Sequence, residues 1–171
     1  MKAIGVVLLL AAVFASHAQA SETVTVKNNP GGIREDFDAQ ARKWAKDGVK
    51  IRLVGSCASA CNMYLMTKYG LDVCAVAGTR LKFHMPYFEI SQDGGRRWSR
   101  EMNPQTIQES KQLWAKNWLG HFSPKLNAVL AKATRNGVIP NPSTEVQGYE
   151  GQFTGSRFYS VKATDFIPTC D

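Results

Sequence analysis

The chain has 171 residues, of which 44% are hydrophobic, and it carries a formal net charge of +7 at pH 7. This length allows one domain with a substantial hydrophobic core, and the sequence contains no repeat, low-complexity tract or interdomain linker. Beyond residue 20, no apolar run approaches the roughly 20 residues that a membrane-spanning helix needs, which excludes a spanning segment there.

The N-terminal residues have the three parts of a secretory signal peptide. Lys2 supplies the positive charge, Ile4–Phe14 is a short apolar run, and the small residues Ala18 and Ala20 form the cleavage site. The apolar run is too short to span about 30 Å of hydrocarbon. We therefore predict cleavage after Ala20 and a single periplasmic or secreted domain over residues 21–171.

The first predicted elements of that domain are a strand, a helix and a second strand. Thr23–Val26 alternates as a strand does, and Asn28–Gly32 (NNPGG) interrupts the pattern. Apolar residues then recur at helical spacing at four positions: Ile33, Phe37, Ala41 and Trp44. Asp47 and Gly48 end this helix. Residues 49–53 alternate as a strand, which Gly55 and Ser56 end.

The next predicted elements are a helix and two strands, followed by two helices and a last strand. The patterns predict a helix over 58–68, strands over 73–77 and 81–84, a polar loop over 89–103, helices over 103–119 and 123–134, and a last strand over 158–161. Strands that alternate with helices favour parallel βαβ units. We therefore expect an α/β fold whose helical C-terminal half packs on the sheet.

The densest basic run is Gly94–Arg100 (GGRRWSR). Basic residues beside an aromatic residue can bind nucleic acid. An exported protein rarely meets nucleic acid, so a solvated surface loop is the better interpretation. We expect no nucleic-acid partner.

Four cysteines follow the predicted signal peptide: Cys57, Cys61, Cys74 and Cys170. Disulfides persist in oxidising compartments, and four cysteines allow three full pairings. A zinc site is the rival, but Cys-x3-Cys is unusual spacing for zinc, and no Cys-x2-Cys or His pair accompanies it. We expect two disulfides and no metal. We favour Cys57 or Cys61 bridging Cys74, because consecutive elements are usually neighbours, with Cys170 taking the remaining partner.

Three segments that follow predicted strands carry residues suited to catalysis: 28–32, 55–61 and 83–86. In open α/β sheets the C-terminal ends of the strands form the site. Ser59 lies at a strand-to-helix turn, and a serine nucleophile needs a base such as His84. Gly31 and Gly32 permit close approach of the backbone to a substrate. Each feature alone also has a structural interpretation, as a helix N-cap, a surface histidine or a turn.

Taken together, the three segments resemble those of the Clp protease proteolytic subunit. Asn28–Gly32 is similar to the Asn-Ser-Pro-Gly-Gly segment that contributes to its oxyanion hole. Gly55–Ala60 (GSCASA) resembles the Gly-x-Ala-Ala-Ser-Met-Ala segment with the nucleophile, and Phe83–Pro86 (FHMP) resembles the Ile-His-Gln-Pro segment with the catalytic histidine. The likeness covers residues 24–88 and, more faintly, 157–160.

This resemblance implies a Clp-protease/crotonase-like spiral of ββα units in one domain. The chain looks closest to small exported members with a Cys-Ala-Ser-Ala-Cys segment. Ser59 and His84 would be the catalytic residues. Backbone amides of Gly31, Gly32 and Ala60 would form the oxyanion hole.

The sequence departs from that family at the third catalytic residue. The family's acid lies shortly before a Phe-x-Ser segment, but residues 152–157 (QFTGSR) contain no carboxylate. Glu150 and Asp165 are the nearest acids, and Glu150 is the better candidate because it lies N-terminal to Phe158, as the family acid does. Loss of the orienting acid of a Ser-His pair reduces the rate by about 10⁴.

We therefore expect an exported serine-hydrolase-like protein that acts on a peptide or small ester without a cofactor. The alternative is a binding or interaction protein that kept the fold and lost the chemistry. A CoA-ester enzyme is a weaker option, since CoA is not expected outside the cytoplasm. A cysteine nucleophile needs a free thiolate, which export disfavours. The sequence does not define the oligomeric state, and an oligomer is possible.

Overall fold

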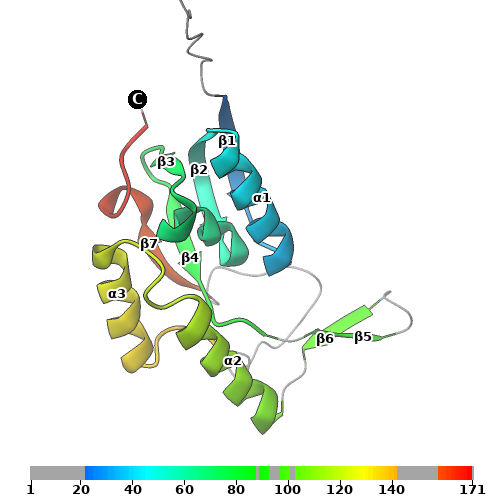
Figure 1. Cartoon of the computed structure of the whole chain (residues 1–171). Helices are drawn as coiled ribbons and strands as arrows, with labels where there is room; N and C mark the ends of the chain where they lie inside the picture. Colours follow the sequence, from blue (N-terminus) through cyan, green and yellow to red (C-terminus); the bar gives the residue numbers. More distant parts are fainter. Residues whose placement is uncertain (1–21, 88, 93–96, 101–102, 142–157, 171) are drawn as a thin grey trace, which may run out of the picture.

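The computed structural model describes residues 22–87, 89–92, 97–100, 103–141 and 158–170 (Figure 1). The predicted signal peptide, Glu150 and part of the basic run lie outside these residues. The strands are β1 (Thr23–Asn29), β2 (Lys50–Ala58), β3 (Asp72–Ala75), β4 (Arg80–Phe83), β5 (Glu89–Gln92), β6 (Arg97–Arg100) and β7 (Tyr159–Lys162). The helices are α1 (Arg34–Lys46), α2 (Pro104–Asn117) and α3 (Pro124–Arg135), with short 3₁₀ helices η1 (Ser59–Leu65), η2 (Thr67–Tyr69) and η5 (Ala163–Asp165).

The main sheet is built around β2. The strand order across this sheet is β1-β2-β4-β7. β1 and β4 run parallel to β2, whereas β7 returns antiparallel to β4. β3 also pairs in parallel with β2, but with its first half, so that Arg52 is opposite Cys74 while Cys57 is opposite Leu81. The predicted α/β class and the parallel pairing of the first strands are therefore confirmed.

The core lies between this sheet and the helices. In β2 the apolar Ile51 and Leu53 are fully buried and alternate with exposed Lys50 and Arg52, as the period of a strand requires. The largest fully buried hydrophobic side chains come from β2, β4, α2, α3 and the loops that join them: Trp114, Phe83, Phe122, Ile51, Leu53, Leu81, Leu126, Leu130 and Ile139. One hydrophobic cluster thus joins all the elements that surround the candidate site.

Helix α1 lies beside β1 and β2 (Figure 1). Its apolar side packs on Tyr64 of η1, with ring centroids 5.5 Å from Phe37 and 5.0 Å from Trp44. Such aromatic pairs contribute about 0.5–1.5 kcal/mol beyond the area they bury. The helix predicted from Ile33 onward is confirmed, and its contacts hold η1 in place.

The C-terminal helices begin where the sequence predicts. Asn103 caps α2 by accepting from the Thr106 amide, and the Thr106 hydroxyl accepts from the Asn103 amide, which forms a capping box. Ser123 caps α3 by accepting from Leu126, and a proline stands in the first turn of each helix. The two helices are also joined by a hydrogen bond from Trp114 Nε1 to Thr134 Oγ1 (2.9 Å).

Three predicted elements differ in the structure. Gly55 does not end β2, which continues to Ala58, because glycine at φ +77° accommodates the irregular pairing with β1. The helix predicted over 58–68 is a 3₁₀ segment followed by a second one, not an α-helix. The predicted loop over 89–103 contains a hairpin of β5 and β6, which extends away from the main sheet in Figure 1.

Both predicted disulfides are present, but the favoured pairing is wrong. Cys57 is bonded to Cys61, and Cys74 to Cys170. Cys74 lies opposite Arg52, so Cys57 is five residues further along β2. At about 3.3 Å per residue this separation is near 16 Å, too far for a disulfide. Backbone bonds between Ala75 and the C-terminal segment bring Cys170 to Cys74 instead.

Candidate functional site

Ser59 lies at the point where β2 ends and η1 begins. Its φ of +52° is rare for a residue other than glycine, and such conformations are concentrated at functional sites. The Cys57–Cys61 disulfide spans this turn with a Cα–Cα distance of 5.3 Å, and both cysteines are fully buried. Ser59 itself remains partly exposed. The disulfide and the buried neighbours therefore hold the turn that presents the hydroxyl.

The NNPGG segment packs directly on this turn. Gly31, at φ +86°, lies so close that a Cβ there would come within 2.6 Å of both Ser59 Cβ and the Ala58 carbonyl oxygen. Asn29 Oδ1 accepts from the Gly31 amide at 2.8 Å, which holds the loop in this conformation. The structure thus brings together the first two of the three segments that the sequence singled out.

The two glycines are not equivalent as oxyanion donors. The Gly31 N–H is already donated to Asn29, whereas Gly32 is exposed beside it. The Ala60 nitrogen lies 3.0 Å from the position that a Gly31 Cβ would occupy, so Ala60 borders the same loop. Among the predicted donors, Gly32 and Ala60 are therefore better suited than Gly31. Their role in an oxyanion hole remains a prediction.

His84 follows β4, the strand next to β2. Ala58 is opposite Lys82 in the parallel register, so Ser59 and His84 both lie just beyond the C-terminal ends of adjacent strands. This is the edge at which open α/β sheets carry their sites. The predicted close approach of the two side chains remains a prediction.

Aromatic rings and a backbone carbonyl surround the imidazole. Its Nδ1 is 2.6 Å from the carbonyl oxygen of Met85. The ring stacks on Tyr87 at 5.2 Å between centroids and meets Phe158 edge to face at 5.3 Å. His84 is partly buried. These contacts restrict the orientation of the ring.

Asn62 joins the two halves of the site, and the sequence analysis missed it. Its Nδ2 donates to the Lys82 carbonyl at 2.7 Å, which links η1 to β4 two residues before His84. The side chain is fully buried, and Oδ1 has no hydrogen-bond partner in the described part of the chain. An amide side chain inside the mostly apolar run 60–66 was the available signal.

The candidate acids do not complete a triad among the described residues. Glu150 lies outside them. Asp165 is exposed in η5, after the Ala163 amide has bonded to the Thr79 carbonyl at the start of β4. His84 is five residues further along, or about 16 Å at 3.3 Å per residue. The structure therefore does not bring Asp165 to His84.

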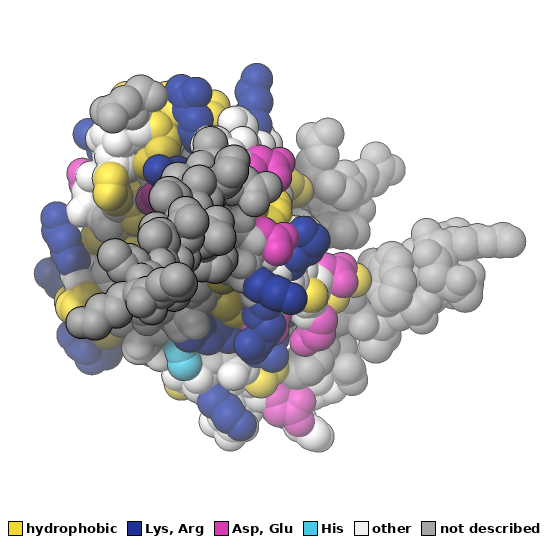
Figure 2. Space-filling model, turned by 45° about the horizontal axis from the view of Figure 1, so that its top comes forward, with side chains coloured by type: hydrophobic (Ala, Val, Ile, Leu, Met, Phe, Trp, Pro, Cys, Tyr) yellow, Lys and Arg dark blue, Asp and Glu magenta, His cyan; other side chains and the backbone are white. Residues whose placement is uncertain are grey.

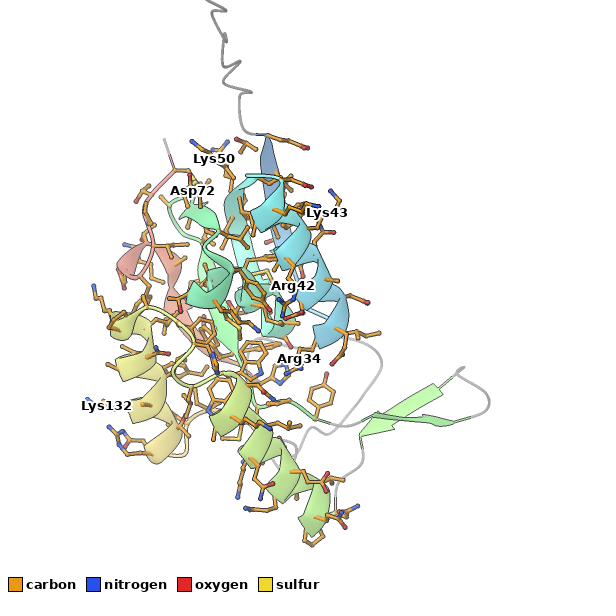
Figure 3. All side chains as sticks on the ribbon, viewed as in Figure 1. Arg34, Arg42, Lys43, Lys50, Asp72 and Lys132 are labelled. Carbon is orange, nitrogen blue, oxygen red and sulfur yellow. A yellow bond between two sulfur atoms is a disulfide. The ribbon has the colours of Figure 1, made fainter. Side chains whose placement is uncertain are left out.

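A separate cavity of about 410 Å³ lies between α1 and the end of α2. Its wall includes Asp38, which binds Arg42 at 2.6 Å and also Lys68 and the Tyr69 hydroxyl. Arg42 extends from α1 in Figure 3. These partners, Arg42 first, hold the pKa of Asp38 well below its usual range. Neither Ser59 nor His84 lines this cavity.

Other charged side chains lie on the surface of the described residues. Figure 2 shows Lys and Arg side chains spread over the face that it draws, with Asp and Glu side chains among them. Within the described ranges, no cluster of His, Cys, Asp and Glu could hold a metal ion. None of the helices described is both long and apolar enough to cross a membrane.

Comparisons with family models, with curated proteins and with solved structures gave no match for this chain.

Proposed function

We propose that the protein is an exported serine hydrolase that cleaves peptide or ester bonds with Ser59 as nucleophile and His84 as base. The observation that carries this proposal is the strained backbone of Ser59 at a strand-to-helix turn. In α/β hydrolases such a turn exposes the serine hydroxyl above the sheet. The position of His84, just beyond the neighbouring parallel strand, supports the pairing.

The chemistry requires only groups of this chain and water. Ser59 Oγ attacks the carbonyl carbon while His84 Nε2 takes the hydroxyl proton. Collapse of the tetrahedral intermediate returns this proton to the leaving amine or alcohol. Water then attacks the acyl carbon and gives a proton to His84. When the second tetrahedral intermediate breaks its bond to Ser59 Oγ, His84 returns this proton to that oxygen, and the acid product leaves. Amides of Gly32 and Ala60 would bind the oxyanion, and one such donor is worth about 3–4 kcal/mol.

Export is part of the same proposal. Two disulfides persist in the oxidising environment that export provides, and the N-terminal sequence has the pattern of a signal peptide. The likeness of the three segments to Clp protease supports both the fold family and the reaction. No cofactor is needed.

A binding protein without catalysis is the second candidate. The observation that favours it is the position of Asp165 at the start of β4, whereas His84 follows the other end of that strand. In that case the Ser59 turn would be a rigid loop of a binding surface. The two candidates differ in whether Ser59 reacts.

Turnover of an activated ester tests the proposal. Ser59→Ala should abolish hydrolysis above the rate of free buffer, and His84→Gln should reduce it at least a hundredfold. Ser56→Ala, on β2 three residues before Ser59, and His121→Gln, in the loop between α2 and α3, are matched controls. Both should retain the wild-type rate. An unchanged rate in Ser59→Ala would favour the binding protein.

A further inference from the structure

We infer that the face of the main sheet opposite the core is a docking surface for an anionic phospholipid membrane. This inference goes beyond the proposed function and does not depend on a reaction at Ser59. It rests on basic side chains from four strands that share this face, which we call the basic sheet face: Lys27, Lys50, Arg52, Arg80, Lys82 and Lys162.

The alternation of β2 defines the two faces of the sheet. Successive side chains of a strand point to opposite faces. Ile51 and Leu53 are fully buried in the core, whereas Lys50 and Arg52 are exposed. The even-numbered residues of β2 therefore lie on the face that points away from the core.

Strand register adds the other cations to this face, although they are scattered in the sequence. Residues that are directly opposite each other on paired strands share a face. Each remaining cation lies opposite an even-numbered residue of β2 or opposite a cation that does. The pairs are Lys27 with Val54, Arg80 with Ser56, Lys82 with Ala58 and Lys162 with Arg80.

Acids do not neutralise the basic sheet face. Asp72 is the acid among the strand positions of this face, and it lies 3.7 Å from Lys50 Nζ. The other cations of the face make no ion pair within the described residues. Arg42 and Lys43 of α1, in contrast, each pair with an acid. The face therefore keeps a positive potential that attracts anions.

Two cations of the face oppose each other across β4 and β7. Arg80 and Lys162 are a directly opposite pair in this antiparallel ladder, and both are exposed. Like charges in such a position destabilise a sheet. Arg80 is also held there, because its Nε donates to Ser160 Oγ and its Nη2 to the Ser160 carbonyl oxygen, each at 3.0 Å. An anionic partner would offset this repulsion.

The arrangement of the charges fits a membrane surface better than other anions. From Lys50 to Ala58, which lies opposite Lys82, β2 spans about 26 Å at 3.3 Å per residue. This span exceeds what one small anion can contact. The strand positions of the face include no aromatic residue on which nucleic-acid bases would stack. Anionic headgroups, in contrast, form an extended negative surface that attracts Lys and Arg.

The test is co-sedimentation of full-length protein with vesicles of equal parts phosphatidylglycerol and phosphatidylcholine, and with vesicles of phosphatidylcholine alone. Residues 1–21 are the same in every variant, so differences between variants report the rest of the chain. Each Lys or Arg near an anionic surface strengthens binding about fivefold. The triple variant Lys27→Gln/Arg52→Gln/Lys162→Gln should therefore bind the anionic vesicles about a hundredfold more weakly.

A matched control removes the same residue types and the same net charge from exposed positions of α2 and α3: Lys111→Gln/Lys132→Gln/Arg135→Gln. This control should weaken binding less than fivefold. Both sets of residues are exposed, so circular dichroism should show native structure in both variants. The single variant Arg52→Gln, with an expected fivefold loss, provides a smaller change on the basic sheet face.

The outcomes decide which partner the face binds. A loss confined to the Lys27/Arg52/Lys162 variant and to anionic vesicles, with weaker binding of wild type at about 0.5 M salt, supports the inference. Equal losses in the two triple variants would mean that net charge alone is responsible and would overturn it. Equal binding of wild type to neutral vesicles, or no binding to anionic ones, would also overturn it. Tighter binding to duplex DNA than to anionic vesicles would assign the face to nucleic acid instead.

Discussion

Gly31 packs so closely against Ser59 that position 31 has no room for a residue larger than glycine. A Cβ on Gly31 would be 2.6 Å from Ser59 Cβ, which is below any normal contact distance. The two residues come from segments that are separate in the sequence, the turn after β1 and the turn after β2. Parallel pairing of these strands brings the turns together. The backbone around the candidate nucleophile is therefore set by a contact that only glycine permits.

Replacement of Gly31 by alanine should disturb both stability and the site. Gly31 and Gly78 share a φ of +86°, but a Cβ on Gly78 would meet nothing within 4 Å. Gly78→Ala should therefore lower the free energy of unfolding only by the conformational penalty, about 1–2 kcal/mol. Gly31→Ala adds the overlap with Ser59 and should lower it further, by about 1–3 kcal/mol as overpacking does.

Urea unfolding of the two variants measures this difference. Gly31→Ala should also slow any reaction of Ser59, whereas Gly78→Ala should leave that reaction unchanged. Equal losses of stability in the two variants would mean that the turn after β1 does not pack on Ser59 as described.

The two disulfides should have different effects when removed. Cys74–Cys170 closes a sequence separation of 96 residues, so Cys74→Ala/Cys170→Ala should lower the free energy of unfolding by about 4–5 kcal/mol. Cys57–Cys61 encloses Ser59 within a separation of four. Cys57→Ala/Cys61→Ala should therefore slow the reaction of Ser59 at least tenfold in protein that is still folded.

Measuring both variants at a temperature where circular dichroism shows native structure keeps the two effects apart. The Cys74/Cys170 variant is the control for the loss of a disulfide in general. Equal reactivity of Ser59 in the two variants would show that the short disulfide does not maintain the turn.

Asp38 should make stability depend on acid pH. Its partners lower the pKa in the folded protein below the unfolded value of about 3.9, so the folded state binds fewer protons. The stabilisation is fully present above the unfolded pKa and is lost as the pH falls toward the folded one. Asp38→Asn should lose about 1 kcal/mol at pH 7, the upper end for partly exposed pairs.

Thermal unfolding of wild type and Asp38→Asn between pH 2 and pH 7 checks this expectation. The difference in Tm should be constant from pH 5 to pH 7 and should narrow below about pH 4. Asp36→Asn, on the same helix, is the control and should stay within about 0.5 kcal/mol of wild type. A constant gap down to pH 2 would contradict the assignment.

The hydrogen bond between α2 and α3 should stabilise the folded protein, because its donor is buried. Trp114 is 1% exposed, and its Nε1 donates to Thr134 Oγ1. Thr134→Val keeps the shape but leaves that N–H unsatisfied, which should lower the free energy of unfolding by about 1–3 kcal/mol. Thr134→Ser keeps the hydroxyl and should lose less. Equal losses in a denaturant titration would show that the hydrogen bond is not the cause.

Much of the fold could be predicted because its signals are local. The spacing of Ile33, Phe37, Ala41 and Trp44 defines α1, and Asn103 and Ser123 begin α2 and α3 through their own side chains. The disulfide pairing could not be predicted, because it depends on strand register. Whether Cys74 lies opposite Arg52 or opposite Cys57 is decided by the whole sheet.

The positions of the candidate site residues could also be predicted in part. The sequence placed Ser59, Gly31 and His84 at strand ends, and parallel pairing of β1, β2 and β4 brings those ends to one edge. The role of Asn62 was missed, because one polar residue in a mostly apolar run does not reveal that its amide bonds to the Lys82 carbonyl. Gly55 was misinterpreted as a strand end because glycine also serves irregular strands.

The most direct test of the central claim is mass-spectrometric mapping of the protein after treatment with a fluorophosphonate. An activated serine forms an Oγ–phosphorus bond and releases fluoride, whereas an ordinary hydroxyl does not react at a comparable rate. We predict stoichiometric modification of Ser59 alone in wild type and in Ser56→Ala, and at least a hundredfold slower modification in His84→Gln. The account would be contradicted if wild-type protein that is folded, with both disulfides formed, were not modified at Ser59. That result would favour a binding protein without catalysis.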